Sequence, residues 1–360
     1  MKNHIPRKVG AEVQRRINAL GVGQKMQDLP EELWHPSFRF YVKEDPNRRG
    51  GPNLRLLRLD PQKPALTVTG FIFNKFVHPK ENRFITPREA ARLQGFPDDW
   101  VFEGTLTSAQ RQVGNAVPVS LATAVAKAML EFGSLQGVFS TTRPKVLSLF
   151  SGAGGLDLGF SNAKSGRYRW NITDAVEFDP DSCKTLQTNS QGHTRVHEQD
   201  IRSFDVARQS EAPDAIIGGP PCQAFSQAGL QKGTADQRGQ MVHEFIRCVS
   251  EALPKCFLME NVSNLKSIDG GKLLAGIITD LEKIGYKVSH SVLNSADFGA
   301  AQLRKRLLIV GFRKDLVSKR FGMPLPTHSA DPEFGLQPHL TVGEALKGLP
   351  KADVPDHAAA

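Results

Sequence analysis

Four side chains that could carry out chemistry on a ring lie in the second half of the sequence. Cys222 follows two glycines and two prolines in IIGGPPCQAFS, and Glu260 follows an apolar run in LMENV. Arg304 and Arg306 stand two residues apart in QLRKRLLIV, so on a strand their side chains point to the same side. A thiol nucleophile, a carboxyl acid and two guanidinium groups are suited to attack on an electron-poor ring.

Each of these features also has a plainer explanation when it is taken alone. A lone cysteine is more often a small core residue, as we expect for Cys183, Cys248 and Cys256. ENV alone could be a surface turn, and QxRxR alone could be a solvated strand edge. The four cysteines show no CxxC or CxxxxH spacing, so neither a zinc site nor a disulfide framework is indicated.

A glycine-rich turn suggests a second site, for a cofactor. The apolar stretch VLSLF ends at Phe150 and runs into SGAGGLDLG, with glycines at 152, 154 and 155. Glycines between a strand and a helix let the backbone approach a ligand closely. The spacing is not GxGxxG, and a simple tight turn explains such a cluster equally well.

Acidic residues at the ends of the next two expected strands favour a cofactor that contains adenosine. Glu177 is placed where an acid binds ribose hydroxyls, and Phe178 beside it could cover the face of an adenine ring. Asp200 could accept a hydrogen bond from the adenine amino group. These residues fit a dinucleotide or S-adenosylmethionine, whereas a triphosphate loop is disfavoured because the Lys-Ser/Thr pair is absent.

The elements that must position these residues alternate between strand and helix from Lys145 onward. Helices are expected at 243–253 and 270–285, and earlier at Thr86, which is a good N-cap before Pro87, and at Pro118. The pattern predicts an α/β fold with a largely parallel sheet covered on both faces. Residues 1–83 and those after Arg313 read as irregular. The expected strands are 146–150, 173–178, 195–201, 214–219, 255–261, 286–294 and 306–312.

Charge is distributed unevenly along the chain. Residues 1–83 hold 16 of the 46 lysines and arginines but 8 of the 37 acidic residues, and the whole chain has a net charge of +9. A basic segment on a nearly neutral body suggests a nucleic-acid partner, with a solvated basic face as the alternative. The sequence has no apolar run of about 18 residues and no apolar signal segment after Met1, which predicts a cytosolic protein without a membrane span.

Taken together, six motifs resemble those of the DNA (cytosine-5)-methyltransferase family over roughly residues 64–313. LSLFSGAGGLDLGF is similar to the cofactor loop, GGPPCQAFS to the nucleophile loop, MENV to the acid motif and QLRKR to the base-contacting strand. RFITPREAARLQGFPDDW and QRQVGNAVP resemble the two carboxyl-terminal motifs of the family. The resemblance implies a Rossmann-like, S-adenosylmethionine-dependent methyltransferase sheet with a small target recognition domain, acting on double-stranded DNA.

The resemblance also implies roles for individual residues. The Cys222 thiolate would add to carbon 6 of a flipped-out cytosine, Glu260 would contact nitrogen 3 and the amino group, and Arg306 with Arg304 would stabilise the side carrying oxygen 2. Gln223 and Ser226 would contact the DNA backbone, and residues 224–239 would form a mobile loop over the base. The implied cofactor contacts are Phe150, Gly152, Gly154, Gly155, Leu156, Glu177, Phe178, Asp200, Ile201, Pro221, Asn115 and Val117.

The order of the motifs departs from the family, because TPREAARLQ and GNAVP precede the cofactor loop instead of following it. The sequence therefore resembles a circular permutation, with both chain ends inside the target recognition domain. The expected division is 1–83 and 314–360 as recognition domain, 84–132 and 145–313 as catalytic domain, and 133–144 as a linker.

The expected function is that of the modification enzyme of a bacterial restriction–modification system. The chain is expected to be monomeric, to have a cognate endonuclease as a functional partner without a stable complex, and to be cytoplasmic and nucleoid-associated through DNA. One alternative is a subunit that needs a second chain to complete recognition. A tRNA methyltransferase is another, but the Cys-Phe-Thr tract of those relatives is missing.

Overall fold

The chain folds into two units that draw on different segments of the sequence. A computed structural model describes residues 1–43, 56–70, 75–207, 211–221, 240–333 and 335–353. The first unit comprises Met1–Asn115, Ala301–Leu303 and His339–Ala360, and the second comprises Ala116–Ala300 and Arg304–Pro338.

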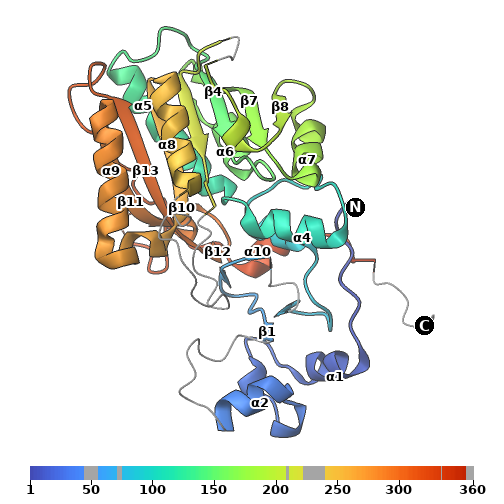
Figure 1. Cartoon of the computed structure of the whole chain (residues 1–360). Helices are drawn as coiled ribbons and strands as arrows, with labels where there is room; N and C mark the ends of the chain where they lie inside the picture. The colour runs from blue at the N-terminus through green and yellow to red at the C-terminus, as the bar shows by residue number, and fades with distance from the viewer. Residues whose placement is uncertain (44–55, 71–74, 208–210, 222–239, 334, 354–360) are drawn as a thin grey trace. The chain divides into compact units, whose positions relative to one another are not determined.

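A seven-stranded sheet forms the second unit, in the order β11-β13-β10-β9-β4-β7-β8 (Figure 1). The five strands from β10 to β8 are mutually parallel, and β13 runs antiparallel to both of its neighbours. This confirms the predicted α/β class and all seven predicted strands, whose ends differ from the prediction by at most three residues. The strands are β4 (Lys145–Leu149), β7 (Asn171–Glu177), β8 (Arg195–Glu198), β9 (Ala215–Gly218), β10 (Cys256–Val262), β11 (Tyr286–Asn294) and β13 (Lys305–Arg313).

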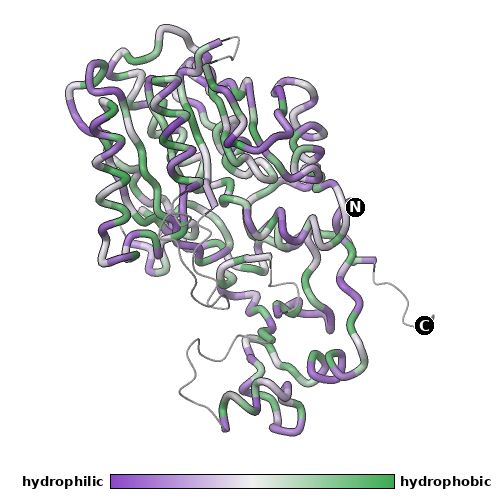
Figure 2. The backbone as a smooth tube through the Cα atoms, in the orientation of Figure 1, coloured by the Kyte–Doolittle hydropathy of each residue, from purple (hydrophilic) through white to green (hydrophobic). Residues whose placement is uncertain are grey.

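Helices cover both faces of this sheet. α5 (Val119–Leu135) and α6 (Gly155–Asn162) pack on one face, and α8 (Gln240–Ala252) and α9 (Lys272–Ile284) pack on the other, while α7 (Pro180–Ser190) connects β7 to β8. Alternate residues of each central strand enter opposite cores, because side chains alternate across a sheet: Leu258 faces α5, and Met259 faces α8. The strands are accordingly hydrophobic along much of their length (Figure 2).

Short elements complete the second unit. α5 continues to Leu135, so the first three residues of the predicted linker are helical. No single helix in the described ranges is long and apolar enough to cross a membrane, although the bent pair of α4 (Leu106–Asn115) and α5 passes that test jointly. The remaining elements are β5 (Lys164–Ser165), β6 (Tyr168–Arg169), β14 (His328–Ser329), β15 (Gln337–Pro338), η4 (Ile201–Ser203), η5 (Ser263–Gly271) and η6 (Ser295–Phe298).

The first unit is more ordered than the sequence suggested. The expectation that residues 1–83 are irregular is wrong for α1 and α2, whose apolar residues Ile17 and Phe38 enter a small core with Met26 and Phe84. Helices α1 and α2 are short and contain few apolar residues, so their sequences show no clear helical periodicity. The elements are α1 (Ala11–Ala19), η1 (Met26–Asp28), η2 (Glu31–Leu33), α2 (Pro36–Lys43), β1 (Leu57–Arg58), β2 (Ala65–Leu66), β3 (Phe76–Val77), α3 (Pro87–Leu93), α4, β12 (Gln302–Leu303) and α10 (Val342–Leu346).

The carboxyl-terminal segment of the chain is bonded to the amino-terminal part within the first unit. The Val342 N–H donates to the Lys63 carbonyl at 2.9 Å, and Arg92 donates to the carbonyl of Lys347 at 2.7 Å. The His4 ring lies 2.9 Å from the Pro350 carbonyl. Residues 304–338, by contrast, belong to the second unit. The division into recognition and catalytic domains stays a prediction.

The stretch TPREAARLQGFPDDW owes its local structure to three side chains. Thr86 caps α3 as predicted, since its hydroxyl accepts the Glu89 N–H at 3.2 Å while the Glu89 carboxylate accepts the Thr86 N–H at 2.8 Å. Arg88 is fully buried and donates to the Pro97 carbonyl at 2.8 Å. Its guanidinium therefore folds the GFPDDW turn back onto the helix that precedes it.

We expect Gly114→Ala to destabilise the first unit strongly. A Cβ at this position would lie 2.0 Å from the Gly70 nitrogen and 2.4 Å from the Thr69 carbonyl carbon, and backbone atoms cannot move aside cheaply. Overpacking of this kind costs about 1–3 kcal/mol or more in the free energy of unfolding. Urea denaturation tests the expectation, with Gly276→Ala as the control because no atom lies within 4 Å of its added Cβ. Equal stability of both variants would contradict it.

Candidate active site

The described candidate residues of the second unit gather at the edge where the parallel strands end. Glu177 ends β7, Asp200 follows β8, Glu260 lies near the end of β10, and the glycine turn follows β4. Because β13 is antiparallel, its first residues lie at the same edge as these strand ends. Ligands of open α/β sheets bind at this edge, so the fold provides one region for both predicted sites.

The glycine turn is held in an unusual backbone conformation. Phe150 has a φ of 53°, which is rare for a residue with a side chain, and Gly152 and Gly154 have φ values of 53° and 79°. Gly154 caps α6, and a Cβ built on Gly152 would meet nothing within 4 Å. The turn therefore presents backbone to an open space beside a helix N-terminus.

Glu177 joins this turn to the end of β7. Its carboxylate accepts three backbone N–H groups, from Gly152 at 2.8 Å and from Phe178 and Asp179 at 2.9 Å each. Glu177 is only 7% exposed, so its side chain is held rigidly. Its Oε1 accepts two of these N–H groups, so Oε2 is the oxygen that keeps acceptor capacity for a further donor. The structure thus brings together the glycine turn and the acid that the sequence proposed for ribose binding.

The neighbouring residues fit an adenosine group. The Phe178 side chain is 71% exposed, which leaves an aromatic ring available for stacking. Asp200 is exposed, and its hydrogen bond with Arg202 lowers the pKa of the Asp200 carboxyl to about 2, so it remains an acceptor. An exposed ring, a fixed carboxylate and an ionised carboxylate along one edge suit the adenine and ribose of a cofactor such as S-adenosylmethionine.

Other predicted cofactor contacts offer mainly backbone atoms. Leu156 is buried in the core beneath α5, and Val117 lies in the same core. Ile201 is buried in the opposite core, whereas Pro221 is exposed. Asn115 is exposed at the end of α4, which belongs to the first unit.

The buried Glu260 and the partly buried Arg306 form an ion pair close to where the parallel strands end. The Glu260 Oε1 and Arg306 Nε atoms are 2.8 Å apart, and Glu260 is 8% exposed. Burial raises the pKa of the Glu260 carboxyl, while the charges of Arg306 and Arg304 oppose that shift. A buried carboxyl beside two guanidinium groups is suited to contact the polar edge of a ring.

Arg304 is also buried next to this pair. Arg304 is 2% exposed. Its burial and the charge of Arg306 lower the pKa of the Arg304 guanidinium to about 9. Leu303 and Lys305 on either side are exposed, so the predicted alternation of side chains is confirmed. Three charged groups with little solvent around them form a preorganised site for a polar ring.

The approach to Cys222 is bonded to this acid motif. The Asn261 Nδ2 donates to the Pro220 carbonyl at 3.1 Å, and a Cβ on Gly219 would lie 3.1 Å from the Glu260 Oε2. Gly219 and Pro220 therefore pass directly beside Glu260. Cys222, Gln223 and Ser226 themselves lie outside the described residues, as does the predicted mobile loop.

Sequence reasoning missed two residues of this region. Asn261, whose amide donates to the Pro220 carbonyl, was noticed only as part of ENV. Asp157, in the first turn of α6, is 7% exposed, and neither of its carboxylate oxygens has a hydrogen-bond partner in the described part of the chain. An acid within the otherwise apolar stretch GGLDLGF was the available signal.

We expect Asp157→Asn to change how stability depends on pH. Burial raises the pKa of Asp157 to about 6, with nearby Ser148 opposing the shift, compared with 3.8 for an ordinary Asp. The folded state therefore bears the cost of an ionised buried carboxylate above pH 6, and this cost disappears as the pH falls from about 6 to about 4. Two pKa units correspond to about 3 kcal/mol, as an upper bound.

Urea denaturation at pH 4.5 and pH 7.5 measures this dependence. Asp157→Asn should gain stability relative to the unmodified chain at pH 7.5, and the gain should shrink at pH 4.5. A difference between the two proteins that does not change with pH would contradict the expected pKa.

The remaining described cysteines are buried thiols, as predicted. Cys183, Cys248 and Cys256 have no solvent exposure. Burial raises the pKa of Cys183 to about 12 and that of Cys248 to about 11, and it raises the pKa of Cys256 as well. Thiols with such pKa values are poor nucleophiles at neutral pH.

The sheet is that of an α/β protein, and the glycine turn and the buried acid at its strand ends are a candidate cofactor site and a candidate reactive centre. Comparison with known proteins makes this specific: the chain matches the family described as C-5 cytosine-specific DNA methylase over residues 14–131 and 144–358. The chain belongs to this family. It is thereby placed among DNA (cytosine-5)-methyltransferases, whose methyl donor is S-adenosylmethionine.

Curated relatives are methyltransferases of restriction–modification type. Type II methyltransferase M.AquIA of Picosynechococcus is 43% identical over 234 residues, which cover 59% of this chain and 91% of that protein. M.NgoFVII of Neisseria gonorrhoeae is 41% identical over 214 residues, covering 59% of this chain and 55% of that protein. M.FnuDI of Fusobacterium nucleatum is 40% identical over 190 residues, covering 53% of each protein. The chain thus spans about half the length of the last two.

Proposed function

We propose that the chain transfers a methyl group to carbon 5 of a cytosine that is flipped out of a specific double-stranded DNA sequence. S-adenosylmethionine supplies the methyl group from its sulfonium. The observation that carries the proposal is the buried Glu260–Arg306 pair, against which Gly219 and Pro220 run just before Cys222. This supports a site in which the acid and the guanidinium act on the same ring as the nucleophile that follows Pro221 in the sequence.

The proposed reaction begins with the Cys222 thiolate, which forms a bond to carbon 6 of cytosine and pushes an electron pair toward carbon 5. Glu260 contacts nitrogen 3 and the amino group, and Arg306 with Arg304 stabilises the charge on the side of oxygen 2. Carbon 5 then takes the methyl group. The carbon 5 proton leaves to a solvent base, and the bond between sulfur and carbon 6 breaks, which restores the thiolate.

The cofactor site follows from the same edge of the sheet. Glu177 would accept the ribose hydroxyls, Phe178 would stack on adenine, and Asp200 would accept from its amino group. The exposed ring of Phe178 and the fixed carboxylate of Glu177 support these roles. The backbone contacts would come from the remaining predicted residues, namely Phe150, Gly152, Gly154, Gly155, Leu156, Ile201, Pro221, Asn115 and Val117.

The chain is proposed to be a circularly permuted member of its family. The motif order supports this, because TPREAARLQ and GNAVP stand before the cofactor loop. The hydrogen bonds of Val342 to Lys63 and of His4 to Pro350 support a recognition domain built from both chain ends. Gln223 and Ser226 would contact the DNA backbone next to the flipped base.

The biological setting is proposed by analogy with the relatives. The chain would act as a monomer in a bacterial cytoplasm, associated with the nucleoid through DNA, and would protect sites that a cognate endonuclease cleaves. A pure single chain that methylates DNA would exclude the need for a second subunit.

Sequencing of methylated cytosines tests the proposed function. A plasmid from cells that express the chain should carry 5-methylcytosine in one sequence context, and a plasmid from cells that express Cys222→Ala should carry none. Methylation that persists in the variant, or is missing with the unmodified chain, would contradict the proposal.

A further inference from the structure

The strand that carries the two arginines is held at its beginning by the end of its neighbour. β11 ends at Asn294, which pairs with Lys305, the first residue of β13. Arg304 lies one residue before β13, beyond the last pair of this ladder. Its backbone groups therefore need partners that the strands themselves do not provide.

Two consecutive residues at the end of β11 provide them. The Asn294 Oδ1 accepts the Arg304 N–H at 3.1 Å, and the Ser295 N–H donates to the Arg304 carbonyl at 2.9 Å. Both backbone polar groups of Arg304 are thereby fixed by the corner that follows β11. The side-chain amide of Asn294 extends the ladder by one residue.

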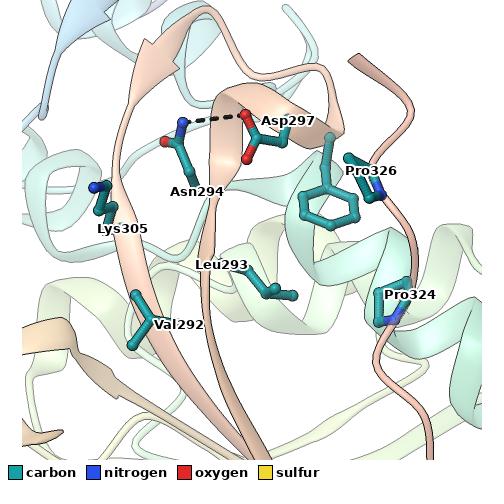
Figure 3. Close-up of a pocket in the computed structure, with 8 residues that line it drawn as sticks. Val292, Leu293, Asn294, Asp297, Lys305, Pro324 and Pro326 are labelled. Carbon is teal, nitrogen blue, oxygen red and sulfur yellow. Dashed lines mark hydrogen bonds between the residues drawn. The ribbon is translucent and has the colours of Figure 1, made fainter. Parts of the chain in front are cut away.

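The orientation of this amide is fixed in turn. The Asn294 Nδ2 donates to the Asp297 Oδ1 at 3.3 Å, as the dashed line in Figure 3 shows. The Asp297 carbonyl accepts the Thr327 N–H at 2.9 Å, so the acceptor is tied to a further segment. A carboxylate accepts hydrogen bonds and does not donate them. The Asn294 nitrogen must therefore face Asp297, which leaves the Asn294 oxygen facing Arg304.

A cavity lies beside this corner. It has a volume of about 240 Å³ and is lined by Val292, Leu293, Phe298, Lys305, Pro324 and Pro326 together with Asn294 and Asp297 (Figure 3). A smaller side chain at position 294 would add to existing space and would not force repacking. Substitution of Asn294 is therefore expected to act through its hydrogen bonds more than through the core.

We propose that Asn294 is a positioning residue for methyl transfer: its amide fixes the backbone of Arg304 and so holds Arg304 and Arg306 in register against Glu260. The inference rests on the proposed function. Arg304 is 2% exposed and Arg306 is paired with Glu260 at 2.8 Å, so a small shift of the strand start would displace guanidinium groups that solvent cannot replace. Misplacement of about 1 Å can cost 100-fold in rate.

The test measures kcat, KM for DNA and the dissociation constant of S-adenosylmethionine in four full-length proteins: the unmodified chain, Asn294→Ala, Asn294→Asp and Pro324→Ala. Asn294→Ala loses both hydrogen bonds, and we expect kcat to fall about 10- to 100-fold while KM and the dissociation constant change less than about threefold. Asn294→Asp is combined with Asp297→Asn, because a carboxylate at position 294 would otherwise face that of Asp297 at about 3.3 Å. The combined variant keeps an acceptor for the Arg304 N–H and should retain more of kcat than Asn294→Ala. Pro324→Ala enlarges the same cavity without touching Arg304 and should leave kcat within twofold.

The possible results separate the inference from the function on which it rests. Asn294→Ala with unchanged kcat, or with a loss no greater than that of Pro324→Ala, overturns the positioning role while the function stands. The variant that combines Asn294→Asp with Asp297→Asn also overturns the positioning role if it is no more active than Asn294→Ala. A joint loss of turnover and cofactor binding in both Asn294 variants does so as well. An unmodified chain that transfers no methyl group overturns both.

Discussion

Glu260→Gln is expected to lower turnover by about 10²–10⁴-fold while the affinity for S-adenosylmethionine stays nearly unchanged. Glutamine has the same shape but neither the charge that Arg306 pairs with at 2.8 Å nor a proton that it can give to a ring nitrogen. Burial raises the pKa of the Glu260 carboxyl, which favours its protonated form relative to an exposed glutamate, whereas an amide has no such acidic group. Rapid-quench methyl transfer gives the turnover, and isothermal titration calorimetry gives the cofactor affinity.

A second Glu–Arg pair of the same chain is the control. Glu282 on α9 contacts Arg320 at 2.8 Å, but both side chains are solvent-exposed and lie away from the strand ends. Glu282→Gln should leave turnover within about twofold, since surface ion pairs contribute little. Loss of cofactor binding in Glu260→Gln would mean that this residue belongs to the cofactor site and that its assigned role is wrong.

Glu177→Ala is expected to weaken S-adenosylmethionine binding by about 10- to 100-fold or more. The substitution removes the acceptor of three backbone N–H groups and frees the glycine turn from β7, in addition to removing the proposed ribose contact. Hydrogen bonds to charged groups contribute about 1.5–3 kcal/mol each, so the loss of a single one accounts for this range. Calorimetric titration with S-adenosylhomocysteine measures the effect without any turnover.

Glu131→Ala is the matched control for this measurement. Glu131 lies on α5, is exposed, and pairs with Lys127 at 3.8 Å. Its removal should leave the affinity unchanged. If Glu177→Ala bound the cofactor as tightly as Glu131→Ala does, the cofactor would not use the end of β7.

Much of the sheet could be predicted because its signals are local. Strands such as 214–219 and 306–312 are continuous apolar runs bounded by turns. The helix cap at Thr86 depends on only four consecutive residues, Thr86 to Glu89. The motifs that indicated the methyltransferase family are also short and have specific sequences. The positions of Glu177 and Glu260 at strand ends then follow, because parallel strands end at one edge.

The contacts that organise the site are not local and could not be predicted in this way. The hydrogen bond between Asn294 and Arg304 joins two strands, and the one between Asn261 and Pro220 spans 41 positions. Gly114 has no room for a side chain because the backbone of Thr69 and Gly70, more than 40 residues earlier in the chain, lies against it. Helices α1 and α2 were missed because their few apolar positions become meaningful only against a core built from distant residues.

The central claim is that Cys222 forms a covalent bond to the target cytosine, and a trapping experiment tests it most directly. In DNA that carries 5-fluorocytosine at the target, fluorine replaces the proton that must leave carbon 5, so the bond between sulfur and carbon 6 should persist after methyl transfer. With S-adenosylmethionine, the unmodified chain should give a complex that survives denaturing electrophoresis, and Cys222→Ser should give none. A complex of equal yield with Cys222→Ser, or none with a chain that methylates ordinary DNA, would contradict the account.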